Sequence, residues 1–196
     1  CEYLLLPLSG TGNSGNLALP LNTESIHTPN MIVDARVLDP EFVPSDVVHR
    51  DAEINLLSSV LRPVTDGDSV DPAFLYGPSG TGKTCIAQYT LDKLRESVID
   101  LNTQYVNCWE NHSHFDTLFQ VLAGVGQTLD IHRQSTPQSL LLDRLHDYDG
   151  PPYVVILDEV DQLDDTNVLY ELKRTPNLSM ILIGNEHEQF YSRLDD

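Results

Sequence analysis

One short segment restricts the fold of this chain more than any other. Residues 77–84 read Gly-Pro-Ser-Gly-Thr-Gly-Lys-Thr, a complete G-x-x-x-x-G-K-[ST] pattern. It directly follows an apolar run at residues 73–76, typical of a strand, and opens a helical pattern over residues 84–96. Glycines let the backbone wrap around phosphate oxygens with its N–H groups pointing inward, and the following helix N-terminus attracts the same charge. The segment therefore predicts a phosphate-binding loop rather than a glycine-rich turn with an incidental lysine.

The chemistry of such a loop assigns a role to each residue type. Lys83 is expected to reach the β- and γ-phosphates of ATP, and Thr84 to offer its hydroxyl to Mg²⁺. The residues expected to bind the cofactor, ATP or ADP, are Gly77, Pro78, Ser79, Gly80, Thr81, Gly82, Lys83 and Thr84.

Short apolar runs and helical patterns alternate along the rest of the chain. Residues 104–108, 154–157 and 180–183 are each predicted as strands, and the last two are continuous apolar runs typical of strands buried on both faces. Between the first two, Phe115, Leu118, Phe119 and Leu122 recur at helical spacing. Strands separated by helices require crossover connections, so we expect an α/β fold with three α/β/α layers around a parallel sheet.

Polar residues follow the last two predicted strands. Asp158 and Glu159 come directly after residues 154–157, and Asn185 comes shortly after residues 180–183. We expect Asp158 to join the Mg²⁺ shell, Glu159 to deprotonate the attacking water, and Asn185 to orient that water beside the γ-phosphate. Taken alone, an asparagine after a strand is a common turn residue. Three further acids are interpreted as solvated surface groups: Asp161, Asp164 and Asp165.

The charge balance is strongly acidic. The chain has 30 Asp and Glu against 11 Lys and Arg, a formal net charge of -19, and its only lysines are Lys83, Lys93 and Lys173. Molar salt shortens the Debye length to about 3 Å and screens such self-repulsion, so a salt-rich cytoplasm explains the composition; an acidic protein of an ordinary cell is the alternative. The acidity argues against a simple nucleic-acid-binding module, which needs a basic face. No apolar run approaches the roughly 20 residues that span a bilayer, so no membrane partner is expected.

The cysteines and the first 30 residues support an intracellular protein with a leader. Cys1, Cys85 and Cys108 are few and irregularly spaced, which favours reduced thiols and a cytoplasmic location. Cys108 with His112 and His114 lacks a fourth ligand at a familiar zinc spacing, so ordinary core and surface roles are favoured. Residues 1–30 contain no Lys or Arg, and we expect a disordered leader or an over-extended N-terminus there, with the nucleotide-binding domain at 31–196.

These motifs together resemble the AAA+ branch of phosphate-loop ATPases. More narrowly, the box Phe42-Val43-Pro44-x3-Val48-His49-Arg50-Asp51 is similar to that of archaeal origin-recognition/cell-division-cycle-six type replication initiators, as are residues 105–108 and 183–195, in a haloarchaeal-like, lysine-poor version. The resemblance implies that Lys83, Thr84, Asp158, Glu159 and Asn185 take the roles given above. It also implies an adenine contact by Val43, Pro44, His49 and Arg50, although helix capping and surface charge are an alternative for His49 and Arg50.

The resemblance also implies partners. The family carries a DNA-contacting insertion that would fall here at residues 131–138, bounded by Ile131 and Gln138 and including His132, Arg133, Gln134, Ser135 and Thr136. Arg133 is the only cation there, so a plain surface loop is the alternative. The chain is expected to be truncated before the family's arginine finger, helical lid with its second-sensor arginine, and winged-helix domain, which would supply most contacts with origin DNA. Other initiator subunits or the replicative helicase are further expected partners.

The sequence thus predicts the ATP-binding and ATP-hydrolysing core of a DNA replication initiator, whose nucleotide state switches assembly on origin DNA. Hydrolysis is expected to be weak in this chain, because a finger from a neighbouring subunit adds about 10³- to 10⁵-fold where a family uses one. Two alternatives stay open. One is a clamp-loader-like or signalling ATPase with the same core, and the other is a nucleotide-gated binding module with negligible hydrolysis.

Overall fold

A parallel sheet forms the centre of the molecule. The computed structural model describes residues 4–7 and 50–185. Within them, five strands lie in the order β1-β2-β5-β4-β3, and each neighbouring pair is parallel. The strands are β1 (Leu4–Pro7), β2 (Ala73–Tyr76), β3 (Asn102–Asn107), β4 (Tyr153–Asp158) and β5 (Leu178–Gly184).

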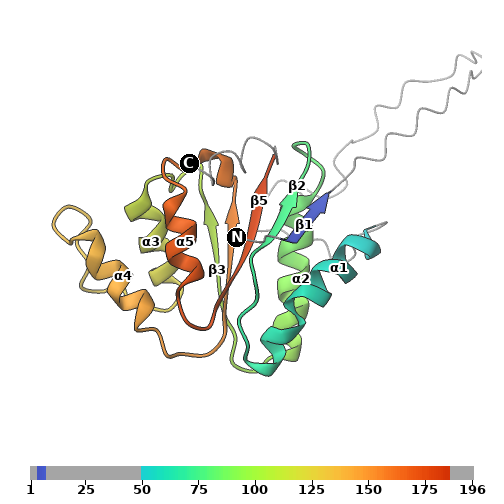
Figure 1. Ribbon diagram of the computed structural model, residues 1–196, viewed down its shortest axis with the longest axis horizontal. Helices are drawn as coiled ribbons and strands as arrows, with labels where there is room; N and C mark the ends of the chain where they lie inside the picture. Colours follow the sequence, from blue (N-terminus) through green and yellow to red (C-terminus); the bar gives the residue numbers. More distant parts are fainter. Residues whose placement is uncertain (1–3, 8–49, 186–196) are drawn as a thin grey trace, which may run out of the picture.

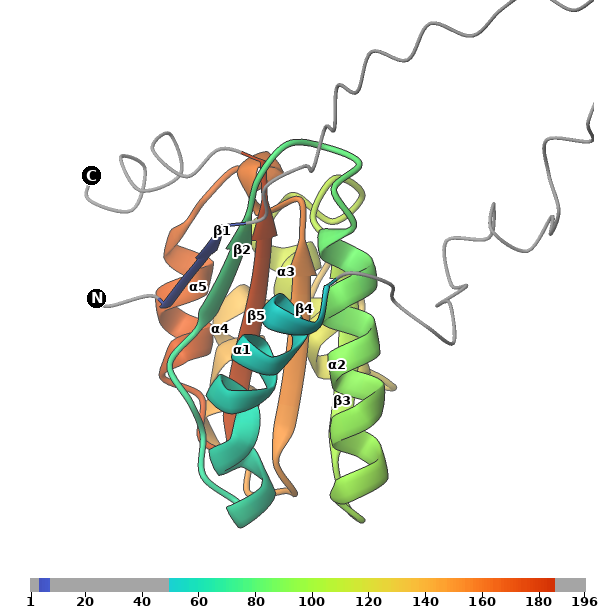
Figure 2. The same ribbon diagram turned by 90° about the vertical axis from the view of Figure 1, so that its right-hand side faces the viewer.

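Helices cover both faces of this sheet. Figures 1 and 2 show α1 (Asp51–Leu61) and α2 (Lys83–Ser97) on one face, with α3 (His114–Ala123), α4 (Gln138–His146) and α5 (Asn167–Lys173) on the other. Two short 3₁₀ helices, η2 (Arg62–Asp66) and η3 (Val160–Gln162), follow α1 and β4. The predicted three-layer α/β/α fold is therefore confirmed. Among the described helices, none combines the length and apolarity needed to cross a membrane.

Strand alternation divides the core into two layers. In β4, Val154 and Ile156 pack with the side chains of α1 and α2, whereas Val155 and Leu157 pack with those of α3, α4 and α5. Successive side chains of a strand point to opposite faces, so Asp158 falls on the α1/α2 face. The continuous apolar run of β4 is thus explained by burial on both sides.

The parallel arrangement collects the strand ends at one edge. In Figure 1 the carboxyl ends of β2 and β5 point to the upper edge, where the loop between β2 and α2 also lies. Residues that follow β2, β4 and β5 therefore meet there, although they are far apart in the sequence. Ligands of open α/β sheets bind at this edge.

Several elements differ from the sequence predictions. The predicted strands start and end within two residues of β2 to β5, but the sequence patterns do not predict the helices α1, α4 and α5. The strand β1 lies inside the segment expected to be a leader, and it pairs with β2 from Leu4↔Ala73 to Pro7↔Tyr76. The other residues of 1–30 lie outside the described residues, so the boundary at residue 31 stays a prediction.

Truncation of a core leucine tests this packing. Leu118 on α3 is fully buried, and Leu118→Ala should lower the free energy of unfolding by about 2–5 kcal/mol, because it removes apolar contacts and leaves a cavity. Leu56 on α1 is 46% exposed, so the control Leu56→Ala should change stability by less than about 0.5 kcal/mol. Urea denaturation in high KCl measures both. Equal effects of the two substitutions would contradict the described core.

Candidate functional site

The loop between β2 and α2 has the backbone that a phosphate cradle requires. The backbone φ angles of Gly77, Gly80 and Gly82 are 148°, 76° and 82°. Residues other than glycine rarely adopt such positive values. A Cβ at Gly80 or Gly82 would meet no atom within 4 Å, so the glycines serve conformation rather than close packing. Gly82 is the N-cap of α2, and its carbonyl accepts the backbone N–H of Ile86 at 3.0 Å. The loop thus leads straight into the helix N-terminus.

A cavity of about 380 Å³ opens beside this loop, within the usual size range of small-molecule sites. It is lined by Ser79, Gly80, Thr81, Gly82, Lys83, Thr84, Cys85, Gln88, Asp158 and Glu159. Residues predicted from two separate motifs therefore share one cavity.

Lys83 lies buried at the centre of the site, with 7% of its surface exposed. Its ammonium donates to the carbonyls of Gly77 at 2.8 Å and Pro78 at 3.0 Å, and to Asn185 Oδ1 at 3.1 Å. Burial lowers the pKa of Lys83, while the carboxylates of Glu159, Asp158 and Asp161 raise it in opposition. The cation is thus held where strand ends meet, with three acids around it.

Asp158 is held by three donors. Thr84 Oγ1 donates to its Oδ2 at 2.6 Å, Tyr105 OH donates to the same oxygen at 3.0 Å, and the backbone N–H of Glu159 donates to Oδ1 at 2.9 Å. The residue is only 5% exposed. A hydroxyl and a carboxylate at this distance are oxygen ligands of the kind that Mg²⁺ prefers, so Thr84 and Asp158 fit the predicted metal site.

Glu159 and Asn185 lie beside Lys83 and complete the polar part of the site. Glu159 has φ 56° and ψ 44°, a left-handed conformation that is uncommon outside glycine, at the point where β4 turns into η3. Asn185 Nδ2 donates to Glu159 Oε2 at 3.0 Å, while Asn185 Oδ1 accepts from Lys83. Asn185 therefore bridges the cation and the predicted base. The five polar residues predicted for the site, Lys83, Thr84, Asp158, Glu159 and Asn185, all lie together.

Asp161 corrects the sequence interpretation. The sequence predicts a solvated surface acid, but Asp161 Oδ2 accepts the backbone N–H of Asn185 at 2.6 Å, and a Cβ on Gly184 would lie 3.0 Å from its Oδ1. It therefore fixes the chain where Asn185 follows β5. Asp161 lies only two residues after Glu159, within one short turn of the same loop. This spacing is the sequence signal that could have placed Asp161 at the site. The other two acids are surface groups paired with histidines, Asp164 with His112 and Asp165 with His114.

The residues predicted to contact adenine are only partly described. Val43, Pro44 and His49 lie outside the described residues. Arg50 precedes α1 and donates to Glu53 Oε1 at 3.0 Å and to the carbonyl of Thr81 at 3.2 Å. It thus connects the start of α1 to the phosphate loop, and its contact with adenine stays a prediction.

The remaining candidates outside this edge have other partners. Arg133, in the segment 131–138, donates to Asp116 Oδ1 at 2.8 Å and lies 4.5 Å from the ring centre of Phe119. Cys108 is fully buried, and burial raises the pKa of its thiol to about 12. Within the described part of the chain, no group of three or more His, Cys, Asp or Glu is arranged to hold a metal ion.

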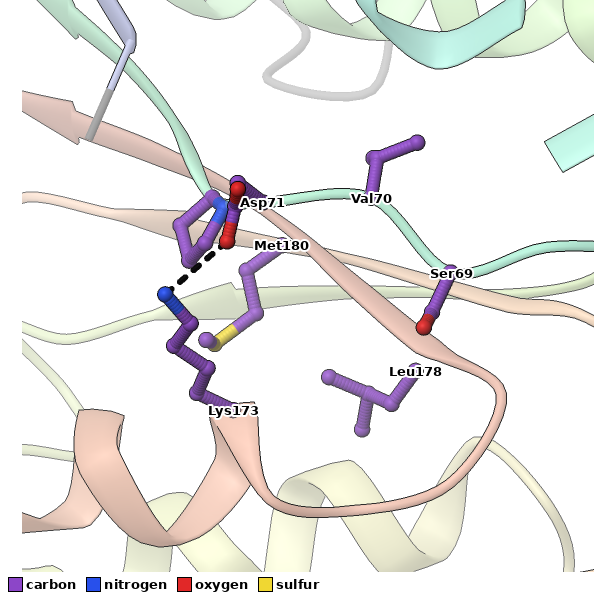
Figure 3. A pocket seen from close by; sticks show the side chains of 7 residues that line it. Ser69, Val70, Asp71, Lys173, Leu178 and Met180 are labelled. Carbon is purple, nitrogen blue, oxygen red and sulfur yellow. Dashed lines mark ion pairs between the residues drawn. The ribbon is translucent and has the colours of Figure 1, made fainter. Parts of the chain in front are cut away.

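A second cavity lies at the opposite end of the sheet, shown in Figure 3, where Lys173 pairs with Asp71 at 2.9 Å. Its volume is about 170 Å³, below the usual range for ligand sites. Its lining residues are Ser69, Val70, Asp71, Pro72, Lys173, Leu178 and Met180. Its one cation is paired, so the phosphate loop carries the stronger candidate site.

Comparison with known proteins finds similar sequences and similar folds. A family model described as an AAA domain matches residues 70–193. Two relatives from Halobacterium salinarum are similar in sequence. ORC1-type DNA replication protein 1 is 60% identical over 165 residues, covering 84% of this chain and 54% of the relative. ORC1-type DNA replication protein 9 is 56% identical over 169 residues, covering 86% and 48%. The chain therefore spans about half the length of the curated relatives it matches.

Two solved structures are similar in fold. The structure of the Aeropyrum pernix ORC1 protein in complex with DNA matches with a TM-score of 0.64 and 27% identity, covering 79% of this chain and 43% of that one. The Aeropyrum pernix ORC2 protein, in ADPNP-ADP complexes, matches with a TM-score of 0.67 and 20% identity, covering 84% and 48%.

Proposed function

The chain belongs to the AAA domain family, and on that premise we propose that it is the ATP-binding and ATP-hydrolysing core of a DNA replication initiator. The observation that carries the proposal is the meeting of Lys83, Asp158 and Glu159 with a glycine-rich loop around one cavity. A cation, a metal-binding carboxylate and a carboxylate base are the groups that phosphoryl transfer to water requires.

Lys83 binds the triphosphate in this proposal. Its ammonium donates to three neutral oxygens in the structure, and phosphate oxygens are stronger acceptors because they carry charge. The phosphates therefore replace the Gly77 and Pro78 carbonyls as its partners. Backbone N–H groups of residues 77–84 and the N-terminus of α2 complete the cradle.

Thr84 and Asp158 would hold Mg²⁺ for these phosphates. The cavity carries two acids, Asp158 and Glu159, against the single cation of Lys83, so a triphosphate needs an added positive charge to enter. An Mg²⁺ ion held by Thr84 and Asp158 would supply this charge and would offset the charge that develops on the phosphate oxygens. Thr84 and Asp158 are already in contact at 2.6 Å.

Glu159 accepts the proton of the attacking water. Its carboxylate is oriented by the Asn185 amide at 3.0 Å, and Asp161 fixes the backbone of Asn185 in turn. A carboxylate within hydrogen-bond reach of water is the requirement for general-base catalysis. Asn185 orients the water without adding charge to a site that already contains three acids.

Similarity to ORC1-type DNA replication proteins supports the initiator part of the proposal. The protein that contains this chain has three proposed kinds of partner: origin DNA, other initiator subunits or the replicative helicase. Within this chain, residues 131–138 are the proposed DNA contact. Arg133 would contact DNA after its salt bridge to Asp116 opens.

A second candidate function is a nucleotide-gated binding module with negligible hydrolysis. It is favoured by one observation: within the described residues that line the cavity, Lys83 is the only cation. Transition-state charge in such sites is often stabilised by an arginine from a neighbouring subunit, worth about 10³- to 10⁵-fold in rate. In this second candidate, the chain binds ATP and hydrolyses it at a negligible rate.

The initiator function is tested by mapping DNA sites in cells. The protein that carries this chain is cross-linked to chromosomal DNA, recovered, and the bound fragments are sequenced. We expect enrichment at the loci where replication starts. Uniform recovery of all loci would contradict the initiator function while leaving ATP binding intact, and a clamp-loader-like or signalling ATPase would then be favoured.

A further inference from the structure

Tyr105 contacts the metal-binding acid from a strand that the phosphate-loop motifs do not include. Its hydroxyl donates to Asp158 Oδ2 at 3.0 Å, the same oxygen that accepts from Thr84. We propose that Tyr105 is a positioning residue, which fixes the carboxylate of Asp158 for the Mg²⁺ of a bound nucleotide. The inference rests on the proposed function and deepens it, because it adds a residue on β3 to the metal site.

The sheet register explains how Tyr105 reaches the site. In the β3–β4 pair, Asn107 lies opposite Asp158, and Tyr105 lies opposite Ile156. Ile156 packs on the α1/α2 face, whereas Val106 packs with the opposite core layer. Tyr105 therefore faces the same side as Asp158, and its ring is long enough to carry the hydroxyl along the strand to that carboxylate.

The hydrogen bonds of Asp158 leave a defined place for the metal. A carboxylate offers about four lone-pair sites, and three are taken by Thr84, Tyr105 and the backbone N–H of Glu159. These donors come from α2, β3 and the residue that follows β4. Because the carboxylate is held from three sides, its remaining lone pair has a fixed direction, which suits it to hold Mg²⁺ together with Thr84.

The exposed fraction of Tyr105 indicates that its side chain acts through its hydroxyl and not through packing in the core. Tyr105 is 40% exposed and belongs to neither core layer, so the ring contributes little to the core. Its hydroxyl instead satisfies a carboxylate that is 5% exposed. Hydrogen bonds to metal-binding groups typically change metal affinity by about 10- to 100-fold.

Tyr153 provides a matched structural control. It is a buried tyrosine on β4 whose hydroxyl donates to the carbonyl of Val121 at 2.5 Å, in the layer on the opposite side of the sheet. Tyr153→Phe removes a hydroxyl hydrogen bond without touching Asp158. It should lower the melting temperature and leave the response to Mg²⁺ unchanged.

The test measures nucleotide binding without turnover. The 196-residue chain, as wild type, Tyr105→Phe and Tyr153→Phe, is titrated with a fluorescent non-hydrolysable ATP analogue, first in EDTA and then at increasing Mg²⁺. For Tyr105→Phe we expect unchanged affinity in EDTA and a Mg²⁺ midpoint raised about 10-fold or more. Circular dichroism confirms that each variant is folded.

The outcomes separate this inference from the proposed function. If the wild type binds with a Mg²⁺-dependent midpoint and Tyr105→Phe shifts that midpoint less than twofold, Tyr105 does not position Asp158. An equal shift in Tyr153→Phe would also overturn the inference, because a general loss of stability would explain both. A folded wild type that binds no nucleotide at all would instead remove the proposed function, and this inference with it.

Discussion

Replacing Glu159 with Gln should lower the rate of phosphate release from ATP by about 10²- to 10⁴-fold while nucleotide binding persists. The amide is the same shape as the carboxylate, and its oxygen can still accept from Asn185 Nδ2, as Glu159 Oε2 does at 3.0 Å. It cannot take a proton from water at neutral pH. The substitution therefore removes the base and leaves Lys83, Thr84 and Asp158 in place.

Single-turnover phosphate release from saturating ATP measures this effect, since the wild-type rate is itself expected to be slow. Glu110→Gln is the matched control, because Glu110 is an exposed acid outside the cavity and its loss changes net charge equally. Its rate should equal that of the wild type. Identical rates for Glu159→Gln and the wild type would assign this chain to nucleotide-gated binding modules without hydrolysis.

Removing the ammonium of Lys83 should abolish most nucleotide affinity. Truncating one partner of a buried, hydrogen-bonded charge pair costs about 2–5 kcal/mol, so Lys83→Ala should weaken ATP binding by roughly 30- to 4,000-fold. Two effects add here. The phosphates lose a cationic donor, and the carboxylates of Asp158, Glu159 and Asp161, which act on Lys83, lose the positive charge among them.

Lys93 offers a control on the same helix. It is exposed, with a salt bridge of 3.0 Å to Glu96, and it lies outside the cavity. Lys93→Ala should bind ATP within about twofold of the wild type, since surface pairs contribute little. Fluorescence anisotropy with a labelled ATP compares the variants. Similar affinities for Lys83→Ala and Lys93→Ala would show that the loop does not hold phosphate.

The phosphate loop and its two acids could be predicted because their signals are local. Residues 77–84 are contiguous, and Asp158 directly ends an apolar run whose burial is complete. Parallel strands then bring their carboxyl ends together, so Asn185 could be placed beside them without coordinates. The resemblance to archaeal replication initiators, argued from residues 42–51, 105–108 and 183–195, is confirmed by relatives at 56–60% identity.

Other features depend on register and packing, which a single sequence does not contain. Tyr105 reaches Asp158 only because β3 and β4 pair with Asn107 opposite Asp158. The role of Asp161 depends on the turn that β4 makes through Glu159 at positive φ. The helix α4 has a weak apolar pattern, with Leu141 and Leu145 buried, and the pairing of β1 with β2 joins segments about seventy residues apart.

Calorimetric titration of Mg-ATP into the folded wild-type chain at multimolar KCl tests the central claim most directly. High salt shortens the Debye length to about 3 Å, so self-repulsion from the net charge of -19 is screened and only short-range contacts at the site contribute. Saturable heat at one nucleotide per chain is the predicted result. The absence of any uptake by a sample that circular dichroism shows to be folded would contradict the account.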